Sequence, residues 1–303
     1  MHSHDHSHHG HHHHDHSAMD RAERNLGLAF FLNLGFALIE LVGGWWAGSL
    51  AILSDALHDF GDALSLGMGY FLQKKSRLKP DENFSYGPKR LSLLAAVASG
   101  LIISLGALSI LRESIPRLWE PTEPNGYAMM GLAILGLTVN GFAAYKMRGG
   151  HTHNEKMMSW HLIEDVLGWA AILIGSLAVI SFGWNWLDPL MAILVSLFVL
   201  YNVFRQLSKT VNLFLQANPN PEGLVEFRRK VLAIDNIQGI HDVHFWSLDG
   251  VHHVLSLHVV STASNLGAIK HQIRELSKSL GHCHLTIEFE APNEVCEIDC
   301  ESH

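Results

Sequence analysis

The chain has 303 residues, of which 48% are hydrophobic and 17% are charged, whereas soluble domains carry about 25% charged residues. Its formal net charge of −8 argues against nucleic acid as a main partner, because nucleic-acid-binding surfaces are basic. The apolar residues are concentrated between about Leu26 and Phe214, and the composition after that is ordinary for a soluble protein. We therefore expect a membrane part followed by one small soluble domain.

A histidine-rich segment opens the chain. The first 16 residues contain ten histidines, and a segment of this composition cannot bury a core, so we expect residues 1–22 to form a disordered tail. Two interpretations stay open: the segment is an affinity tag, or it is a flexible metal collector. The interspersed Ser, Asp and Gly residues favour the collector. It lacks the apolar stretch of a cleavable signal peptide, so the first span is expected to direct insertion.

Six apolar stretches follow within residues 23–212. Each is long enough to cross a hydrocarbon layer about 30 Å thick, which takes roughly 20 helical residues. They are Asn25–Trp46, Ser49–Gln73, Leu91–Leu111, Tyr127–Tyr145, Met157–Ser181 and Leu187–Leu207.

Basic residues in the loops predict the orientation of these spans. An even number of spans puts both termini on one side of the membrane, and cytoplasmic loops are those rich in Lys and Arg. The loops after the second and fourth spans contain Lys74, Lys75, Arg77, Lys79, Lys89 and Arg90, and Lys146, Arg148 and Lys156. Both termini are therefore expected in the cytoplasm.

The region 213–292 has the pattern of a soluble domain. We expect helices at Glu222–Ile234 and Asn265–Leu280, and strands at Gly239–Leu248, His252–Val260 and His284–Glu290. This order predicts a small α+β domain with helices on one face of an antiparallel sheet. Residues 293–303 form a tail in which Cys296 and Cys300 either bind metal or are unstructured. With Cys283 they make a poor disulfide framework, which indicates a reducing compartment or metal binding.

Alternation along the expected strands assigns their side chains to faces. In the first strand it places His241 on the same side as Phe245 and opposite His244. In the last strand it places His284 and Glu290 on one side, but about 20 Å apart, so they cannot both bind one ion.

Ionisable side chains are concentrated in the second and fifth spans, although each costs roughly 2.5–3.5 kcal/mol near the bilayer centre. The spacing His58-x3-Asp62 in the second span recurs as His161-x3-Asp165 in the fifth. Residues four apart lie on one helix face, so two such helices facing each other offer two imidazole nitrogens and two carboxylates. This is a suitable tetrahedral set for Zn2+, whereas Ca2+ and Mg2+ prefer oxygen ligands.

Neighbouring polar residues leave alternatives open. The two pairs could be polar contacts between helices, which their repeated spacing disfavours. For Asp59 and Glu164 the polar-contact interpretation is stronger, and otherwise they support the ligands or line a cavity; Asp55 is either a ligand or a partner of His58. Asn33 and Glu40, seven residues apart on one face of the first span, either line the same water path or pack against Asn140 in the fourth.

At these residues the sequence resembles the cation diffusion facilitator family, in particular its bacterial zinc/proton antiporters. Gly48–His58 followed by Asp62 is similar to the family's second-span signature, and His161-x3-Asp165 is similar to its fifth-span counterpart. The resemblance runs from about Arg24 to Pro292. It also includes Phe84-x-Tyr86-Gly87-x3-Arg90, Asp188-Pro189 and His241–Leu248.

The resemblance implies a homodimer whose cytoplasmic domains have a metallochaperone-like, ferredoxin-like fold. It implies Zn2+ as the preferred substrate, with Cd2+ and other divalent transition metals as further candidates. It assigns the transport site to His58, Asp62, His161 and Asp165.

The resemblance also implies a metal site in the cytoplasmic domain. By family position its ligands are His241, His258 and Glu290, with His271 as an alternative. Isolated surface histidines are the competing interpretation. Some family members carry a further site between the second and third spans, which is not expected here because Gln73–Lys89 contains no histidine.

Together these features predict a transporter, not an enzyme, that exports cytoplasmic Zn2+ in exchange for protons by alternating access. Histidine suits this exchange because it titrates near physiological pH, and metal binding displaces protons from its ligands. A metal-gated channel and a metal sensor without transport are the alternatives. An intramembrane metalloprotease is disfavoured because the chain has no His-Glu-x2-His helix and four ligands leave no position for water. The expected location is a bacterial inner membrane.

Overall fold

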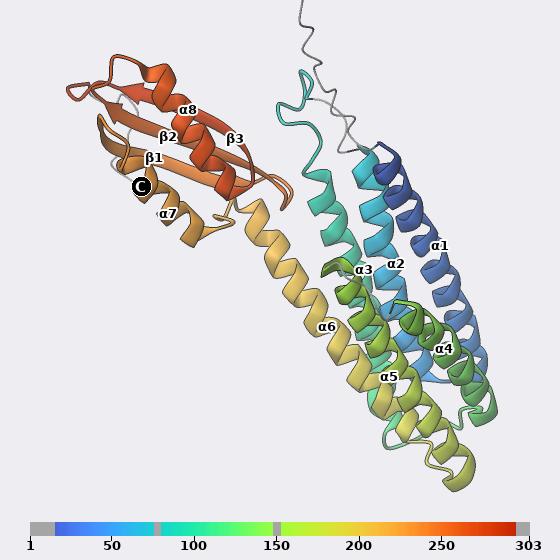
Figure 1. Ribbon diagram of the computed structural model, residues 1–303. Coiled ribbons are helices and arrows are strands. Elements are labelled where there is room, and N and C mark those ends of the chain that lie inside the picture. The colour runs from blue at the N-terminus through green and yellow to red at the C-terminus, as the bar shows by residue number, and fades with distance from the viewer. Residues whose placement is uncertain (1–15, 76–79, 148–152, 295–303) are drawn as a thin grey trace, which may run out of the picture. The chain divides into compact units, whose positions relative to one another are not determined.

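The computed structural model describes residues 16–75, 80–147 and 153–294, with side chains within 30–65, 67–68, 80–145 and 162–294 (Figure 1). The chain divides into a unit of residues 1–74 and 103–199 and a unit of residues 75–102 and 200–303. Most of the histidine-rich segment, together with Cys296 and Cys300, lies outside the described residues.

Six long helices cover the six expected spans. They are α1 (His16–Ala47), α2 (Leu50–Lys75), α3 (Leu91–Arg117), α4 (Gly126–Met147), α5 (His153–Phe182) and α6 (Leu187–Phe214). Residues 16–22, expected to belong to the disordered tail, are helical instead. The reason is that Ala18–Glu23 is rich in residues with high helix propensity.

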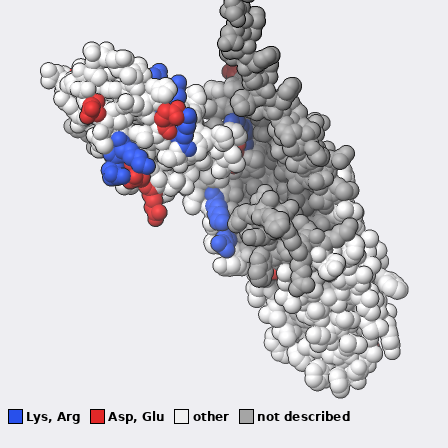
Figure 2. Space-filling view, in the orientation of Figure 1, with Lys and Arg blue, Asp and Glu red and all other residues white. Residues whose placement is uncertain are grey.

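Five of these helices, α1 and α3 to α6, are long and apolar enough to cross a membrane. The helix α2, whose side chains are described only within residues 50–65 and 67–68, is not among them in the described part of the chain, so its role as a sixth span stays a prediction. Large apolar side chains such as Trp45 and Phe204 are exposed on the helices. On the face in Figure 2, most charged side chains lie on the C-terminal domain, further blue side chains lie below it, and the lowest part of the view is uncharged.

The first unit is packed around Trp169 of α5, which is 1% exposed. A Cβ added at Gly136 of α4 would lie 2.2 Å from Trp169 Cδ2, so only glycine lets these two helices approach this closely. Ala51 and Ile52 of α2 belong to the same buried cluster. The start of α2 is therefore part of the core that α4 and α5 build.

The second unit contains the C-terminal domain. Its elements are α7 (Pro221–Leu232), β1 (Ile237–Ser247), β2 (His252–Ser261), α8 (Leu266–Ser277), a 3-10 turn (Lys278–Leu280) and β3 (His282–Glu290). This confirms the expected order of helices and strands. The strands lie in the order β1-β2-β3, with β1 antiparallel to β2 but β3 parallel to it. The expected antiparallel sheet is wrong for β3, because α8 crosses over and returns the chain to the end where β2 begins.

The helices of this domain cover one face of the sheet. Leu255, Leu257 and Val259 of β2 share a core with Phe227 of α7 and Ile273 of α8. Successive strand residues point to opposite faces, so the even-numbered residues of β2, including His258, lie on the uncovered face.

Candidate metal centres

A β-bulge in β1 determines which of its side chains reach the uncovered face. His241 pairs with His258 and His244 pairs with Ser256, so three steps along β1 match two along β2. The extra residue is accommodated at Asp242, whose φ of 48° is a left-handed conformation that aspartate tolerates. The prediction that His241 and His244 lie on opposite faces is therefore wrong, and both lie on the uncovered face.

His241, His258 and Glu290 come together on this face, one from each strand. One ligand atom of each lies within 4.8 Å of the others. The carboxylate of Glu290 joins the two rings, with Oε2 3.1 Å from His241 Nε2 and Oε1 2.6 Å from His258 Nδ1. The side chains of His258 and Glu290 are 5% and 8% exposed, and that of His241 is 33% exposed. Two imidazoles and one carboxylate are a donor set that fits Zn2+ and leaves a fourth position open.

Two acidic side chains that were not singled out in the sequence approach the other ring nitrogen of His258. Asp242 Oδ2 and Glu288 Oε2 each lie 3.4 Å from His258 Nε2. A carboxylate at this nitrogen fixes the tautomer and the ring orientation of a metal-binding histidine. Strand alternation could have identified Glu288, because it lies two residues before Glu290 on the same side of the strand. Asp242 could not be identified in this way, because it lies at the bulge, where the alternation is broken.

His271, the alternative ligand, does not join this group. Its side chain is exposed on α8, and α8 packs on the opposite face of the sheet through Ile269 and Ile273. Within one chain, the uncovered face therefore brings together the first three expected ligands without His271.

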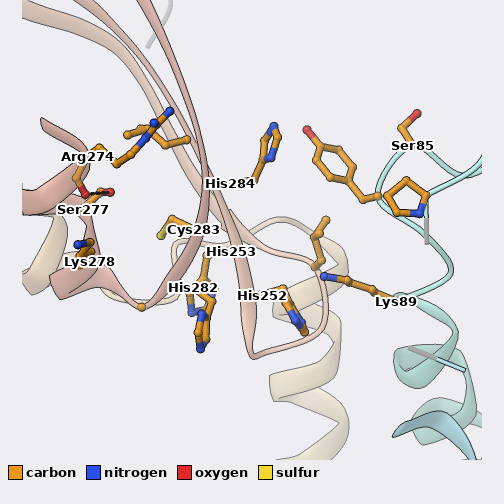
Figure 3. A pocket seen from close by; sticks show the side chains of 15 residues that line it. Ser85, Lys89, His252, His253, Arg274, Ser277, Lys278, His282, Cys283 and His284 are labelled. Carbon is orange, nitrogen blue, oxygen red and sulfur yellow. Dashed lines mark hydrogen bonds between the residues drawn. The ribbon is translucent and has the colours of Figure 1, made fainter. Parts of the chain in front are cut away.

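Further histidines gather where β2 and β3 begin (Figure 3). The side chains there include His252, His253, His282, Cys283 and His284. His252 Nδ1 lies 2.7 Å from Asp249 Oδ2, and burial lowers the pKa of His253. Among the residues whose side chains are described, no three of these form a ligand group, so we assign no metal site there.

The helix α2 presents its ionisable side chains toward neighbouring helices of the first unit. His58 Nε2 lies 3.8 Å from Asp62 Oδ2, and both side chains are half-buried. Asp55, about one turn earlier, is buried, and its Oδ1 lies 3.8 Å from where a Cβ of Gly168 would be. Because Gly168 belongs to α5, the carboxylate of Asp55 faces that helix.

Acidic side chains of α1 and α5 converge on this part of α2. Asp165 of α5 lies within electrostatic range of Asp55, and Glu40 of α1 lies within electrostatic range of both. Glu40 is 1% exposed and lies beside Asp59 of α2. The choice between the water path and packing against Asn140 therefore stays open. Glu164 is exposed on α5.

Three of the four expected transport ligands are thus described. His58 and Asp62 lie together on α2, and Asp165 lies on α5 near Asp55. The side chain of His161 lies outside the described residues. A nitrogen and several carboxylate oxygens between apolar helices can bind a divalent cation and release protons as they do so.

Comparisons with known proteins point to one family. The family described as the cation efflux transmembrane domain matches residues 26–215. The cadmium, cobalt and zinc/H(+)-K(+) antiporter of Bacillus subtilis (strain 168) is 32% identical over 286 residues, which cover 90% of this chain and 91% of that protein. The zinc transporter ZitB of Escherichia coli (strain K12) is 33% identical over 244 residues, 79% of this chain and 78% of ZitB. The metal cation efflux system protein CzcD of Cupriavidus metallidurans is 30% identical over 287 residues, 93% of this chain and 90% of CzcD.

Proposed function

Because the chain belongs to the cation diffusion facilitator family, we propose that it exports Zn2+ from the cytoplasm in exchange for protons. The observation that carries this proposal is that His58 and Asp62 lie together on α2, while Asp55 of the same helix lies within electrostatic range of both Asp62 and Asp165 of α5. Relatives named for cadmium and cobalt as well as zinc make those ions further candidate substrates. Transport of this kind converts no substrate into a product, so the proposal makes the chain a transporter and not an enzyme.

Proton exchange follows from the chemistry of the proposed ligands. Zn2+ binds neutral imidazole and ionised carboxylate, so binding at His58, Asp62, His161 and Asp165 displaces protons. When the site opens to the outer side, protons compete for the same atoms and release the metal. Histidine makes this competition effective because it titrates near physiological pH. For this cycle α2 must span the membrane despite its three aspartates, and its acidic face must border water or protein.

The cytoplasmic group is proposed to sense the metal. His241, His258 and Glu290 have a donor set suited to Zn2+, and the side chain of His241 is partly exposed. Zinc binding there would favour the transport-competent arrangement of a homodimer. Both termini are assigned to the cytoplasm, since the basic loops after α2 and α4 fit that orientation. The chain is assigned to a bacterial inner membrane, since the relatives named above are bacterial.

Purified protein in sealed vesicles tests the transport function. A zinc-sensitive dye and a pH-sensitive dye inside the vesicles report both fluxes when a pH gradient is imposed. We expect gradient-dependent zinc flux in the parent chain and none in Asp62→Ala or Asp165→Ala. Glu164→Gln is the matched control, because Glu164 is an exposed acid next to Asp165, and its flux should equal that of the parent.

Each other outcome has a distinct meaning. Zinc flux that persists in both aspartate variants would exclude the proposed site. Zinc flux without an opposing proton flux would exclude exchange and favour a metal-gated channel.

A further inference from the structure

The first turn of α2 is capped by a residue of another helix. Asp188, in the first turn of α6, is 2% exposed. Its carboxylate accepts hydrogen bonds from Ser49 Oγ at 2.5 Å, from the Leu50 N–H at 2.8 Å and from the Ala51 N–H at 3.3 Å. The first N–H groups of a helix have no partner within it, so Asp188 supplies acceptors that α2 itself lacks.

Two further contacts continue along the same two helices. Ser54 Oγ lies 2.9 Å from Ser196 Oγ and 3.4 Å from the carbonyl oxygen of Ala192. One turn further, the ring of His58 meets the ring of Phe198 edge-on, with the centroids 6.1 Å apart. From its first residue to its histidine, α2 is therefore held in one register against α6.

We propose that Asp188 is a positioning residue for transport, whose carboxylate sets the axial position and rotation of α2 and so places His58 and Asp62 toward Asp165. This role rests on the proposed transport site. A helix advances about 1.5 Å and turns about 100° per residue, so even a small change at the cap moves every side chain that follows. The positive end of the helix dipole favours a carboxylate there, and three donors converge on it.

An amide cannot replace this carboxylate. Asn at position 188 keeps one acceptor oxygen but puts an NH2 group where the second oxygen accepts the Leu50 N–H. Asp188→Asn should therefore shift α2. Asp188→Glu keeps the negative charge and should keep α2 closer to its position in the parent. Asn125→Ala is the matched control, since Asn125 Oδ1 caps α4 through the Ala128 N–H and does not join α2 to α6.

The position of α2 can be measured without zinc. In a full-length chain whose three cysteines are replaced by serine, Ser54→Cys and Ser196→Cys create a pair that an oxidant can cross-link. The same chains in vesicles give the zinc concentration for half-maximal flux and the maximal flux. For Asp188→Asn we expect cross-linking about tenfold slower and a half-maximal concentration about tenfold higher, both partly restored in Asp188→Glu. Asn125→Ala should match the parent in both measurements.

Several outcomes decide the matter. Cross-linking and half-maximal concentration both unchanged in Asp188→Asn would overturn the role. Slower cross-linking with unchanged zinc dependence would overturn the link to the site. If Asp188→Asn fails to fold, Ser49→Ala, which removes one of the three hydrogen bonds, must shift both readouts in the same direction by less. A parent chain without zinc flux would defeat the proposed function instead, and cross-linking alone would then decide whether Asp188 places α2.

Discussion

Replacing Glu290 with Gln should weaken zinc binding by the cytoplasmic domain roughly 100-fold. The change removes the negative charge and one of the three ligands while keeping the shape of a side chain that is 8% exposed. If three ligands share equally in a micromolar affinity of about 8 kcal/mol, losing one costs about 2.7 kcal/mol, which is that factor of roughly 100. The variant should lose nearly all of this 2.7 kcal/mol share of the binding free energy, because Glu290 contacts both His241 and His258.

Competition with a zinc-binding dye measures this affinity in the detergent-solubilised chain. Every sample carries Asp62→Ala and Asp165→Ala and lacks residues 1–15, so that the proposed transport site and the histidine-rich segment do not contribute. Glu275→Gln is the matched control, since Glu275 lies on α8, which packs on the opposite face of the sheet, and is 48% exposed, and its Kd should change by less than about threefold. Equal zinc affinity in the Glu290 and Glu275 variants would refute a ligand role for Glu290.

Two predictions concern the stability of the fold. Burial alone would raise the pKa of Asp249, but hydrogen bonds from the N–H groups of His252 and Val251 lower this pKa overall. The ionised carboxylate therefore stabilises the domain at pH values above the ordinary pKa of aspartate. This contribution is lost as the pH falls through the lowered pKa of the folded state. Asp249→Asn should cost about 1–2 kcal/mol at neutral pH and much less near pH 2, as thermal unfolding at both pH values would show; an equal loss at both would contradict it. Gly136→Ala should destabilise the helical unit by about 1–3 kcal/mol, because its Cβ would meet a buried ring at 2.2 Å. Gly131→Ala, with nothing within 4 Å, should not, and equal heat-induced aggregation of the two would disprove the packing argument.

Local spacing accounts for what could be predicted about the membrane site. His58 and Asp62 are four residues apart on one helix, so their proximity follows from helix geometry alone. The approach of Asp55 to α5 at Gly168 depends on how two helices pack, and no pattern within α2 specifies that. The same limit applies to Asp188, whose likeness to a family motif gave no indication that it caps α2.

The cytoplasmic domain shows where strand patterns were sufficient and where they were not. Alternation holds in β2, where the pairing register is regular, and it puts His258 opposite the buried Leu257 and Val259. It failed for His241, because a residue with a left-handed backbone at Asp242 inserts one extra step. The direction of β3 was predictable in principle, since a helical connection such as α8 is typical of parallel neighbours.

Because of the bulge in β1, having the proposed ligand residues in the sequence is not enough to form the site. Phe245 is anchored in the core and Ile240 packs against it, so a β1 without the bulge would turn its first half over, burying His241 and exposing Ile240. A β-branched residue at position 242 strongly disfavours the left-handed conformation and would push the strand that way. Every ligand would still be present in the sequence, yet they could no longer meet. The proposed metal response would thus depend on one backbone angle, and comparing ligand positions alone would not tell a domain that can bind the metal from one that cannot.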